Sequence, residues 1–146
     1  MFSELSPPGQ PTAAEVAPSP QAADAAVARM REMSADLRGC AVLGRGGEVL
    51  AASGEPERWQ EPCAVLWGAA DLAGPEPASH LHVGTEDGEV FALRHAGLAM
   101  VAVSERFALA SLMLSDMRMA LRELAGAPGM DDVHEPRRAR SRARRT

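Results

Sequence analysis

Apolar residues in the first patterned segment of the chain recur along one side of a helix. Ser19 and Pro20 stand directly before that segment, and serine at the N-cap followed by proline at the first helical position favours a helix start. Residues 21–37 are rich in alanine, and Gly39 follows them as a glycine suited to ending a helix. The pattern predicts a helix over 21–37.

Two hairpins and one further strand are predicted after this helix. The turn at 45–47 contains two glycines, and the turn at 87–88 is Asp-Gly, the strongest short hairpin signal in the chain. The five predicted strands span 40–44, 48–53, 80–86, 89–95 and 98–103.

The predicted strands differ in how their polar residues are placed. Residues 41–43, 90–93 and 98–103 are apolar on both faces, which is typical of strands that are covered above and below. Residues 80–83 instead alternate between histidine and apolar residues, as a half-exposed strand does. We therefore expect 80–83 at an edge of the sheet.

Residues 62–73 form a helical segment with almost no polar face. Asp71 is its only charged residue, and Trp59 stands just before it. Because a surface helix normally shows a polar face, we expect both sides of this helix to be covered. The sheet covers one side, and a second copy of the chain is the simplest cover for the other.

A third helix is predicted over 104–124, with Ser104 as its N-cap. A helical wheel places one broad apolar stripe along this segment, between Leu109 and Leu124. The candidate contacts for a partner protein lie outside that stripe and are Leu112, Asp116, Met119 and Glu123.

The elements occur in the order α-β-β-α-β-β-β-α, which predicts an α/β chain of the α+β sandwich type. We expect a five-stranded, mainly antiparallel sheet with helices on both faces. Residues 1–20 are rich in proline and 127–146 in arginine, so neither segment can offset the entropy cost of ordering by burying apolar surface. The sequence thus predicts disordered tails at 1–20 and 127–146 around one domain at 21–126.

The C-terminal tail hides how acidic the rest of the chain is. The net charge is −5, and removing the six arginines of 137–146 leaves −11 for residues 1–136. An acidic body is poorly suited to binding a phosphate backbone, whereas an arginine-rich tail can bind nucleic acid, anionic lipid or an acidic protein surface, or only aid solubility. The tail arginines are Arg137, Arg138, Arg140, Arg142, Arg144 and Arg145.

The sequence presents no arrangement typical of catalysis, cofactor binding or metal binding. Cys40 and Cys63 have neither metal nor redox spacing. His80 and His82 share one strand face but lack the third ligand that zinc requires. The glycine-rich 44–47 leads into a strand instead of the helix that follows a phosphate-binding loop. We therefore predict no catalytic residue, no cofactor and no metal.

The beginning of the chain lacks the basic start and the apolar core of a signal peptide. No run of residues approaches the roughly 20 apolar positions needed to cross a bilayer. The sequence therefore predicts a cytoplasmic protein without a transmembrane segment.

In three segments the sequence resembles the Roadblock family, which includes dynein light chains and bacterial Mgl-type regulators of Ras-like GTPases. The segments that carry the resemblance, together with the Trp- and Ala-rich second helix, are GCAVLGRGGEVLAASG (39–54), HLHVGTEDGEVFALR (80–94) and GLAMVAVSE (97–105). The second helix as predicted is shorter than usual for the family, and Pro62 and the two tails also depart from its pattern.

The resemblance implies a non-catalytic scaffold that forms a homodimer and binds a small Ras-like GTPase without inserting an arginine finger. It also implies that the second helix and the neighbouring edge strand form the dimer contact. On this chain that contact comprises Val65, Leu66, Trp67, Ala69, Ala70, His80, Leu81, His82 and Val83.

Two other functions stay open from the sequence alone. The chain could be a nucleic-acid or anionic-membrane adaptor that works through its arginine tail. It could also be an enzyme or small-molecule sensor, although no residue pattern asks for either.

Overall fold

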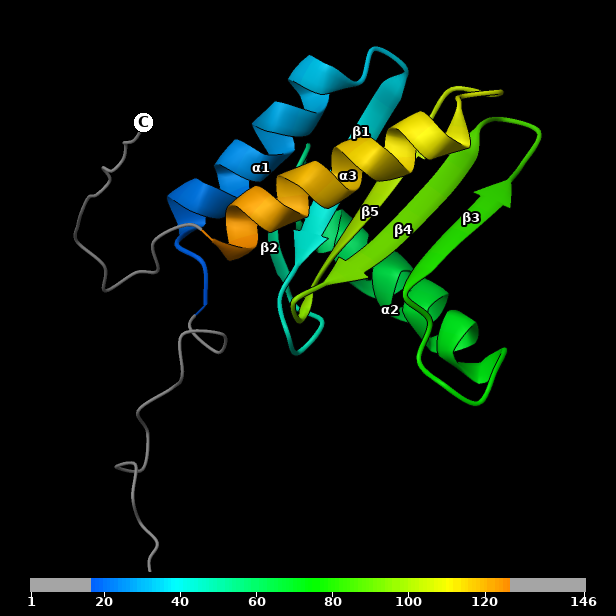
Figure 1. Ribbon diagram of the computed structural model, residues 1–146, viewed down its shortest axis with the longest axis horizontal. Coiled ribbons are helices and arrows are strands. Elements are labelled where there is room, and N and C mark those ends of the chain that lie inside the picture. The colour runs from blue at the N-terminus through cyan, green and yellow to red at the C-terminus, as the bar shows by residue number, and fades with distance from the viewer. Residues whose placement is uncertain (1–16, 127–146) are drawn as a thin grey trace, which may run out of the picture.

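The computed structural model describes residues 17–126. The elements, in chain order, are α1 (Pro20–Met33), β1 (Leu37–Leu43), β2 (Val49–Ala52), α2 (Glu57–Leu72), β3 (His80–Gly84), β4 (Glu89–His95), β5 (Leu98–Ser104) and α3 (Ala110–Ala125) (Figure 1). The predicted order of three helices and five strands is confirmed.

The five strands form one antiparallel sheet in the order β2-β1-β5-β4-β3 (Figure 1). The three strands that are apolar on both faces lie in the middle, because only there does a layer cover each face. The alternating strand β3 lies at an edge, as predicted, and β2 forms the other edge.

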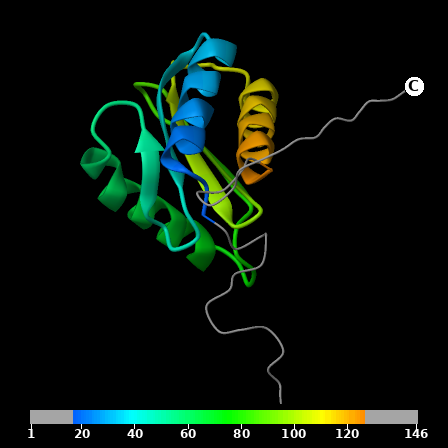
Figure 2. The same cartoon turned by 90° about the vertical axis from the view of Figure 1, so that its left-hand side faces the viewer.

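Helices cover both faces of the sheet, with α1 and α3 side by side on one face and α2 alone on the other (Figure 2). The larger buried cluster lies beneath α1 and α3 and includes Met30, Phe91, Met117 and Leu121. The smaller cluster lies beneath α2. Its buried members are Leu43, Cys63, Trp67, Ala92, Ala99 and Val101.

The first helix ends earlier than predicted. It is capped by Ser34, and the chain is already in β1 at Leu37, so Gly39 is a strand residue and not a helix end. A Cβ on Gly39 would lie 2.8 Å from Ser53 Oγ and 3.2 Å from Trp59 Cζ2. The glycine is therefore needed for close packing between β1, β2 and α2.

The second helix begins earlier than predicted, at Glu57, and it includes both Trp59 and Pro62. Proline lacks the N–H that would bond to the carbonyl four residues earlier, yet α2 continues past Pro62 and is 16 residues long in total. Pro62 thus does not mark the helix start, and the second helix is not short.

The third helix begins at Ala110, six residues later than predicted. Ser104 is the last residue of β5, is fully buried, and donates its hydroxyl to the Glu105 carbonyl instead of capping a helix. Leu109 occupies the N-cap without a side-chain hydrogen bond. Segments 1–16 and 127–146, which include most of the predicted N-terminal tail and all six tail arginines, lie outside the described residues.

Candidate functional site

The outward face of the C-terminal half of α2 is unusual for a helix surface, because its large exposed side chains are apolar, whereas the first turns of α2 expose the charged Arg58 and Glu61. Val65 is 64% exposed and Leu72 87% exposed. Gly68 and Ala69 are exposed between them, at the spacing that places all four residues on one side of a helix. We call Val65, Gly68, Ala69 and Leu72 the outer face of α2.

The inward side of α2 packs on the sheet. Leu66 and Ala70 are partly buried against the smaller cluster, and Trp67 is only 6% exposed. The structure thus corrects the placement of Trp67, which was predicted at a contact between two copies. Its side chain is buried inside the protomer, so it can support the outer face only from beneath.

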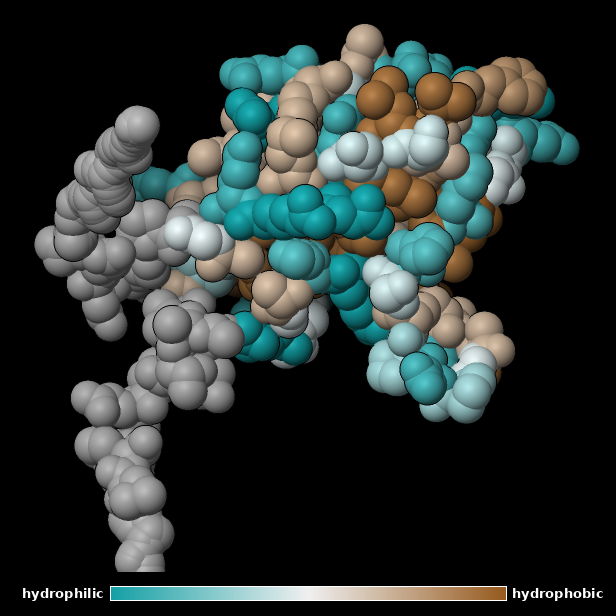
Figure 3. Space-filling view, in the orientation of Figure 1, coloured by the Kyte–Doolittle hydropathy of each residue, from teal (hydrophilic) through white to brown (hydrophobic). Residues whose placement is uncertain are grey.

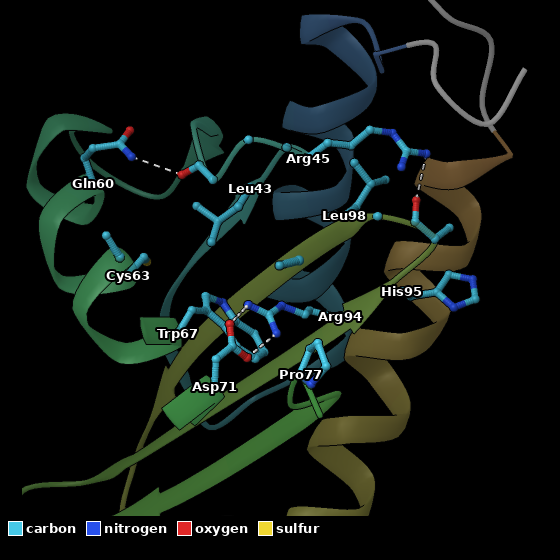
Figure 4. A pocket seen from close by; sticks show the side chains of 17 residues that line it. Leu43, Arg45, Gln60, Cys63, Trp67, Asp71, Pro77, Arg94, His95 and Leu98 are labelled. Atoms are coloured by element: carbon cyan, nitrogen blue, oxygen red, sulfur yellow. Dashed lines mark hydrogen bonds and ion pairs between the residues drawn. The ribbon is translucent and has the colours of Figure 1, made fainter. Parts of the chain in front are cut away.

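A charged group fixes the C-terminal part of α2 to the sheet. Arg94 Nη1 and Nη2 donate to Asp71 Oδ1 and Oδ2 over 2.7 and 2.9 Å, and Nη1 also donates to the Ala78 carbonyl over 2.8 Å. The Arg94 guanidinium carbon lies 4.0 Å from the centre of a Trp67 ring, a cation–π arrangement. Figure 4 shows Trp67, Asp71 and Arg94 converging.

The Arg94 hydrogen bond and, next, the Ala78 N–H hydrogen bond lower the pKa of Asp71 to about 2. This carboxylate therefore stays ionised at neutral pH. In the sequence, Asp71 stands four residues after Trp67. This spacing places the two side chains on the same face of a helix, and it was the available indication that Asp71 lies near Trp67.

Strand β3 has an open outer edge beside α2. Arg94 N–H donates to the Ser79 carbonyl and Thr85 N–H to the Gly88 carbonyl, so these two residues that flank β3 bond toward β4. Hydrogen bonding alternates along an antiparallel strand, so His80, His82 and Gly84 turn their backbone N–H and C=O groups outward. Leu81 packs on the same cluster as Leu66 and Ala70, which places the edge next to α2.

The two histidines of β3 lie on the α3 side of the sheet. His82 stacks on the buried Phe91 with ring centres 4.4 Å apart, and its Nε2 contacts the Glu89 carboxylate. The His82 contact is the largest cause of the lowered pKa of Glu89. Across residues 17–126 no group of three candidate ligands surrounds either histidine.

The candidate partner surface on α3 is divided by the structure. Leu112 and Met119 are exposed, as predicted from the helical wheel. Asp116 instead accepts a 2.9 Å hydrogen bond from Ser34 Oγ, and Glu123 pairs with Arg29 over 3.1 Å. Both acids therefore tie α3 to α1.

Two exposed apolar residues just before α3 were not predicted from the sequence. Phe107 is 80% exposed and Leu109 66% exposed, and both stand just before α3. Figure 3 shows apolar side chains gathered around the N-terminal end of α3. The misplaced helix start explains the omission, because it put Leu109 in the buried stripe.

Phe107 also has an uncommon backbone. Its φ of 64° lies in the left-handed region, which is unfavourable for a bulky residue. Its N–H donates to Glu89 Oε2 over 2.6 Å, and Arg106 lies over its ring. These contacts fix the position of the Phe107 side chain, although its ring is exposed to solvent.

Neither cysteine suits nucleophilic chemistry. Cys40 and Cys63 are buried, and burial raises the pKa of both thiols to about 11. A thiol in this state is overwhelmingly protonated at neutral pH and is a poor nucleophile.

Within residues 17–126, the helices are too short or too polar to span a bilayer.

Comparison with known proteins identifies the fold. A Roadblock/LC7 domain from Streptomyces avermitilis matches with a TM-score of 0.57 and 16% identity, over 68% of this chain and 91% of that one. Myxococcus xanthus MglB matches with a TM-score of 0.58 and 12% identity, over 73% and 86% of the two chains. The gliding protein MglB from Thermus thermophilus gives 0.54 and 16%, over 72% and 87%.

No protein-family model and no curated protein matches the sequence. The structural matches nevertheless show that the chain has the fold of Roadblock/LC7 domains, and the resemblance predicted from the sequence is confirmed at the level of the fold.

Proposed function

We propose that this chain is a non-catalytic, homodimeric scaffold of the cytoplasm that binds a small Ras-like GTPase. The observation that carries the proposal is an apolar outer face on α2 beside an open strand edge at β3. Contiguous apolar surface of this kind typically marks a protein interface, and an open edge can pair with another strand. Two copies meeting here would cover both features at once.

The fold supports the same arrangement. The sequence resemblance to the Roadblock family implies dimerisation through the second helix and the adjacent edge strand. The structure exposes the outer face of α2 and the β3 edge, although Trp67 is used internally. The GTPase partner follows from that resemblance and from the structural likeness to the two MglB proteins.

The dimer is tested by placing a charge on the outer face of α2. We expect Val65→Glu and Leu72→Glu each to raise the dimer dissociation constant about a hundredfold or more, because an unpaired carboxylate buried between two copies costs several kcal/mol. Size-exclusion chromatography with light scattering measures the mass in solution. Leu112→Glu is the matched control, since it makes the same change on α3 and should leave the dimer intact.

The contribution of the strand edge is tested separately with His80→Pro. Proline is tolerated in an edge strand when the lost N–H faces outward, so the protomer should keep its thermal stability while the dimer weakens. A wild-type protein that is monomeric at micromolar concentration contradicts the dimer. Unchanged mass for all three variants contradicts the assignment of this surface.

The partner is tested with purified Ras-like GTPases from the same organism, loaded with GDP or a non-hydrolysable GTP analogue. We expect calorimetric binding that depends on the nucleotide, with Leu112→Glu or Met119→Glu weakening it while the mass stays dimeric. Equal, negligible heats for every GTPase and nucleotide state contradict the proposed partner.

A further inference from the structure

A pocket of about 660 Å³ lies between α2 and the turns that join β1 to β2 and β4 to β5 (Figure 4). Pockets that hold small molecules typically occupy roughly 300–1,000 Å³. The pocket opens at the end of the sheet, and none of the four residues of the outer face of α2 lines it. It therefore stays available whether or not two copies meet through that face.

The inner wall of the pocket is apolar. Leu43 and Ala99 contribute from the sheet, and Cys63 and Trp67 contribute from α2. These four side chains belong to the smaller buried cluster, so their positions are fixed by packing inside the protomer. An apolar body inserted here would extend that cluster without rearranging it.

Arg45 is the cation at the mouth of the pocket. Its Nη2 donates to the Ala96 carbonyl over 3.1 Å, which carries the side chain from the β1–β2 turn across to the β4–β5 turn (Figure 4). No carboxylate within residues 17–126 forms an ion pair with it. The other guanidinium N–H groups can therefore be used by a ligand.

The turn opposite Arg45 is shaped to receive its guanidinium. Gly97 has a φ of 82°, and a Cβ at this position would collide with Arg45 Nη1. A side chain at 97 would thus suffer both backbone strain and a steric clash. The absence of a side chain at Gly97 makes room for the Arg45 guanidinium.

Three other polar side chains of the pocket, those of Arg94, Asp71 and Gln60, are already engaged. Arg94 is paired with Asp71 and the Ala78 carbonyl. Gln60 accepts from Val49 N–H and donates to the Gly47 carbonyl, which ties α2 to the β1–β2 turn. These groups shape the walls, and of the two arginines that line the pocket Arg45 is the one without a carboxylate partner among the described residues.

Trp67 gives a second, independent indication that the pocket can bind a ligand. Its Nε1 is buried and has no hydrogen-bond partner in the described part of the chain. Leaving a buried donor unpaired costs about 1–3 kcal/mol. An acceptor atom on a molecule bound in the pocket would relieve that cost after a small movement of the indole.

We propose that this pocket binds a small organic anion, with an apolar body against Leu43 and Ala99 and an acidic group on Arg45. The acidic group is a carboxylate, sulfonate or phosphate, since each offers the paired oxygen atoms that a guanidinium binds. A ligand there would contact the inner side of α2 directly, so the scaffold would also sense a small molecule. The proposal does not depend on the dimer or on the GTPase.

A fluorescent probe with the required chemistry tests the proposal on the full chain. Anilinonaphthalene sulfonate has an apolar body and one sulfonate, and N-phenyl-1-naphthylamine is its uncharged counterpart. We expect Arg45→Gln to weaken binding of the sulfonate about tenfold, the loss of one charge-assisted hydrogen bond, and to leave binding of the uncharged probe unchanged. Arg58→Gln, which removes a positive charge from the exposed side of α2, should affect neither probe.

Two further measurements place the probe in the pocket. In a nitrogen–proton correlation spectrum the sulfonate should shift the indole N–H signal of Trp67 and spare that of Trp59, whose N–H donates to the Ser53 carbonyl over 3.0 Å. Ala64→Phe should block both probes by filling the pocket mouth from α2, where Ala64 is exposed.

Equal sulfonate affinity in wild type, Arg45→Gln and Ala64→Phe would overturn the proposal, as would absence of binding to the wild-type chain. Because Ala64→Phe leaves Arg45 and its hydrogen bond untouched, it decides the matter even if Arg45→Gln loosens the two turns.

Discussion

The two faces of the sheet differ in how completely helices and buried apolar residues cover them. The cluster between the sheet and helices α1 and α3 has 17 buried residues, whereas the cluster between the sheet and α2 has six. Two helices share the first face and one helix lies across the second. The first face is held by apolar packing, and the second is held in part by the ion pair of Arg94 with Asp71 and by the stacking of Arg94 on Trp67.

This difference separates the work of the two faces. We call the face covered by α1 and α3 the closed face. It provides most of the free energy of folding, because apolar area removed from water dominates stability. The α2 face contributes less and keeps an apolar outer surface, an open strand edge and a pocket. Substitutions on the two faces should therefore have different consequences, and four of them test the comparison.

The largest effect is expected from Phe91→Ala on the closed face. Phe91 is fully buried, and removing a buried phenylalanine side chain costs about 4 kcal/mol through lost transfer energy and the cavity left behind. Urea unfolding followed by circular dichroism measures the loss. Phe107→Ala is the control, since that ring is exposed and its removal should change stability by less than about 0.5 kcal/mol.

A smaller loss is expected from Gly39→Val, where the sheet meets the start of α2. The new side chain collides with Ser53 Oγ and the Trp59 ring, and overpacking of this kind costs about 2 kcal/mol. Displacement of Trp59 should appear as stronger acrylamide quenching of tryptophan fluorescence. Gly84→Val places the same side chain in open space and should show neither change.

Ser34→Ala should cost about 1 kcal/mol, the usual contribution of one hydrogen bond. Ser34 is buried and donates to Asp116 between α1 and α3. Thermal unfolding measures the shift, and Ser115→Ala on the exposed side of α3 serves as the matched control. No difference between the two variants would show that the contact adds nothing to the closed face.

The smallest effect concerns Asp71, and it is measured as a change in the pH dependence of stability in acid. Its folded pKa of about 2 lies below the ordinary 3.8, so the ionised carboxylate stabilises the fold above about pH 4. That contribution is lost as pH falls toward about 2. The free energy of unfolding of Asp71→Asn should depend less on pH across this window than that of wild type.

Asp24→Asn is the control for this titration, because Asp24 is an exposed residue of α1 that forms no ion pair among the described residues. A wild-type profile that runs parallel to that of Asp71→Asn would mean that the Arg94 contact does not form in solution.

Element order and edge placement were predictable because they depend on patterns that neighbouring residues share. Alternation in 80–83 identified the edge strand, and apolar strands identified the middle of the sheet. Helix ends were less predictable, since they depend on competition between local signals. Pro62 looked like a first helical residue, yet α2 begins at Glu57, and Trp59 in its first turn donates to the Ser53 carbonyl.

The same competition misplaced the start of α3. Ser104 is a good N-cap in sequence, but its burial at the end of β5 uses it otherwise. Leu109 carries no capping signal at all. Within the candidate surface, an apolar helix with one charge indicated that something must cover it, but periodicity could not show that Trp67 faces inward. The Arg45 pocket depends on two turns distant in sequence, which no local pattern brings together.

Phe107 has a consequence for how this sequence can drift. Glycine or asparagine at 107 would adopt the left-handed backbone with less strain, and an exposed ring gives little in return for the protomer. Folding of the protomer therefore gains little from a phenylalanine at this position, and Phe107→Gly should leave the thermal stability of the chain unchanged or slightly higher.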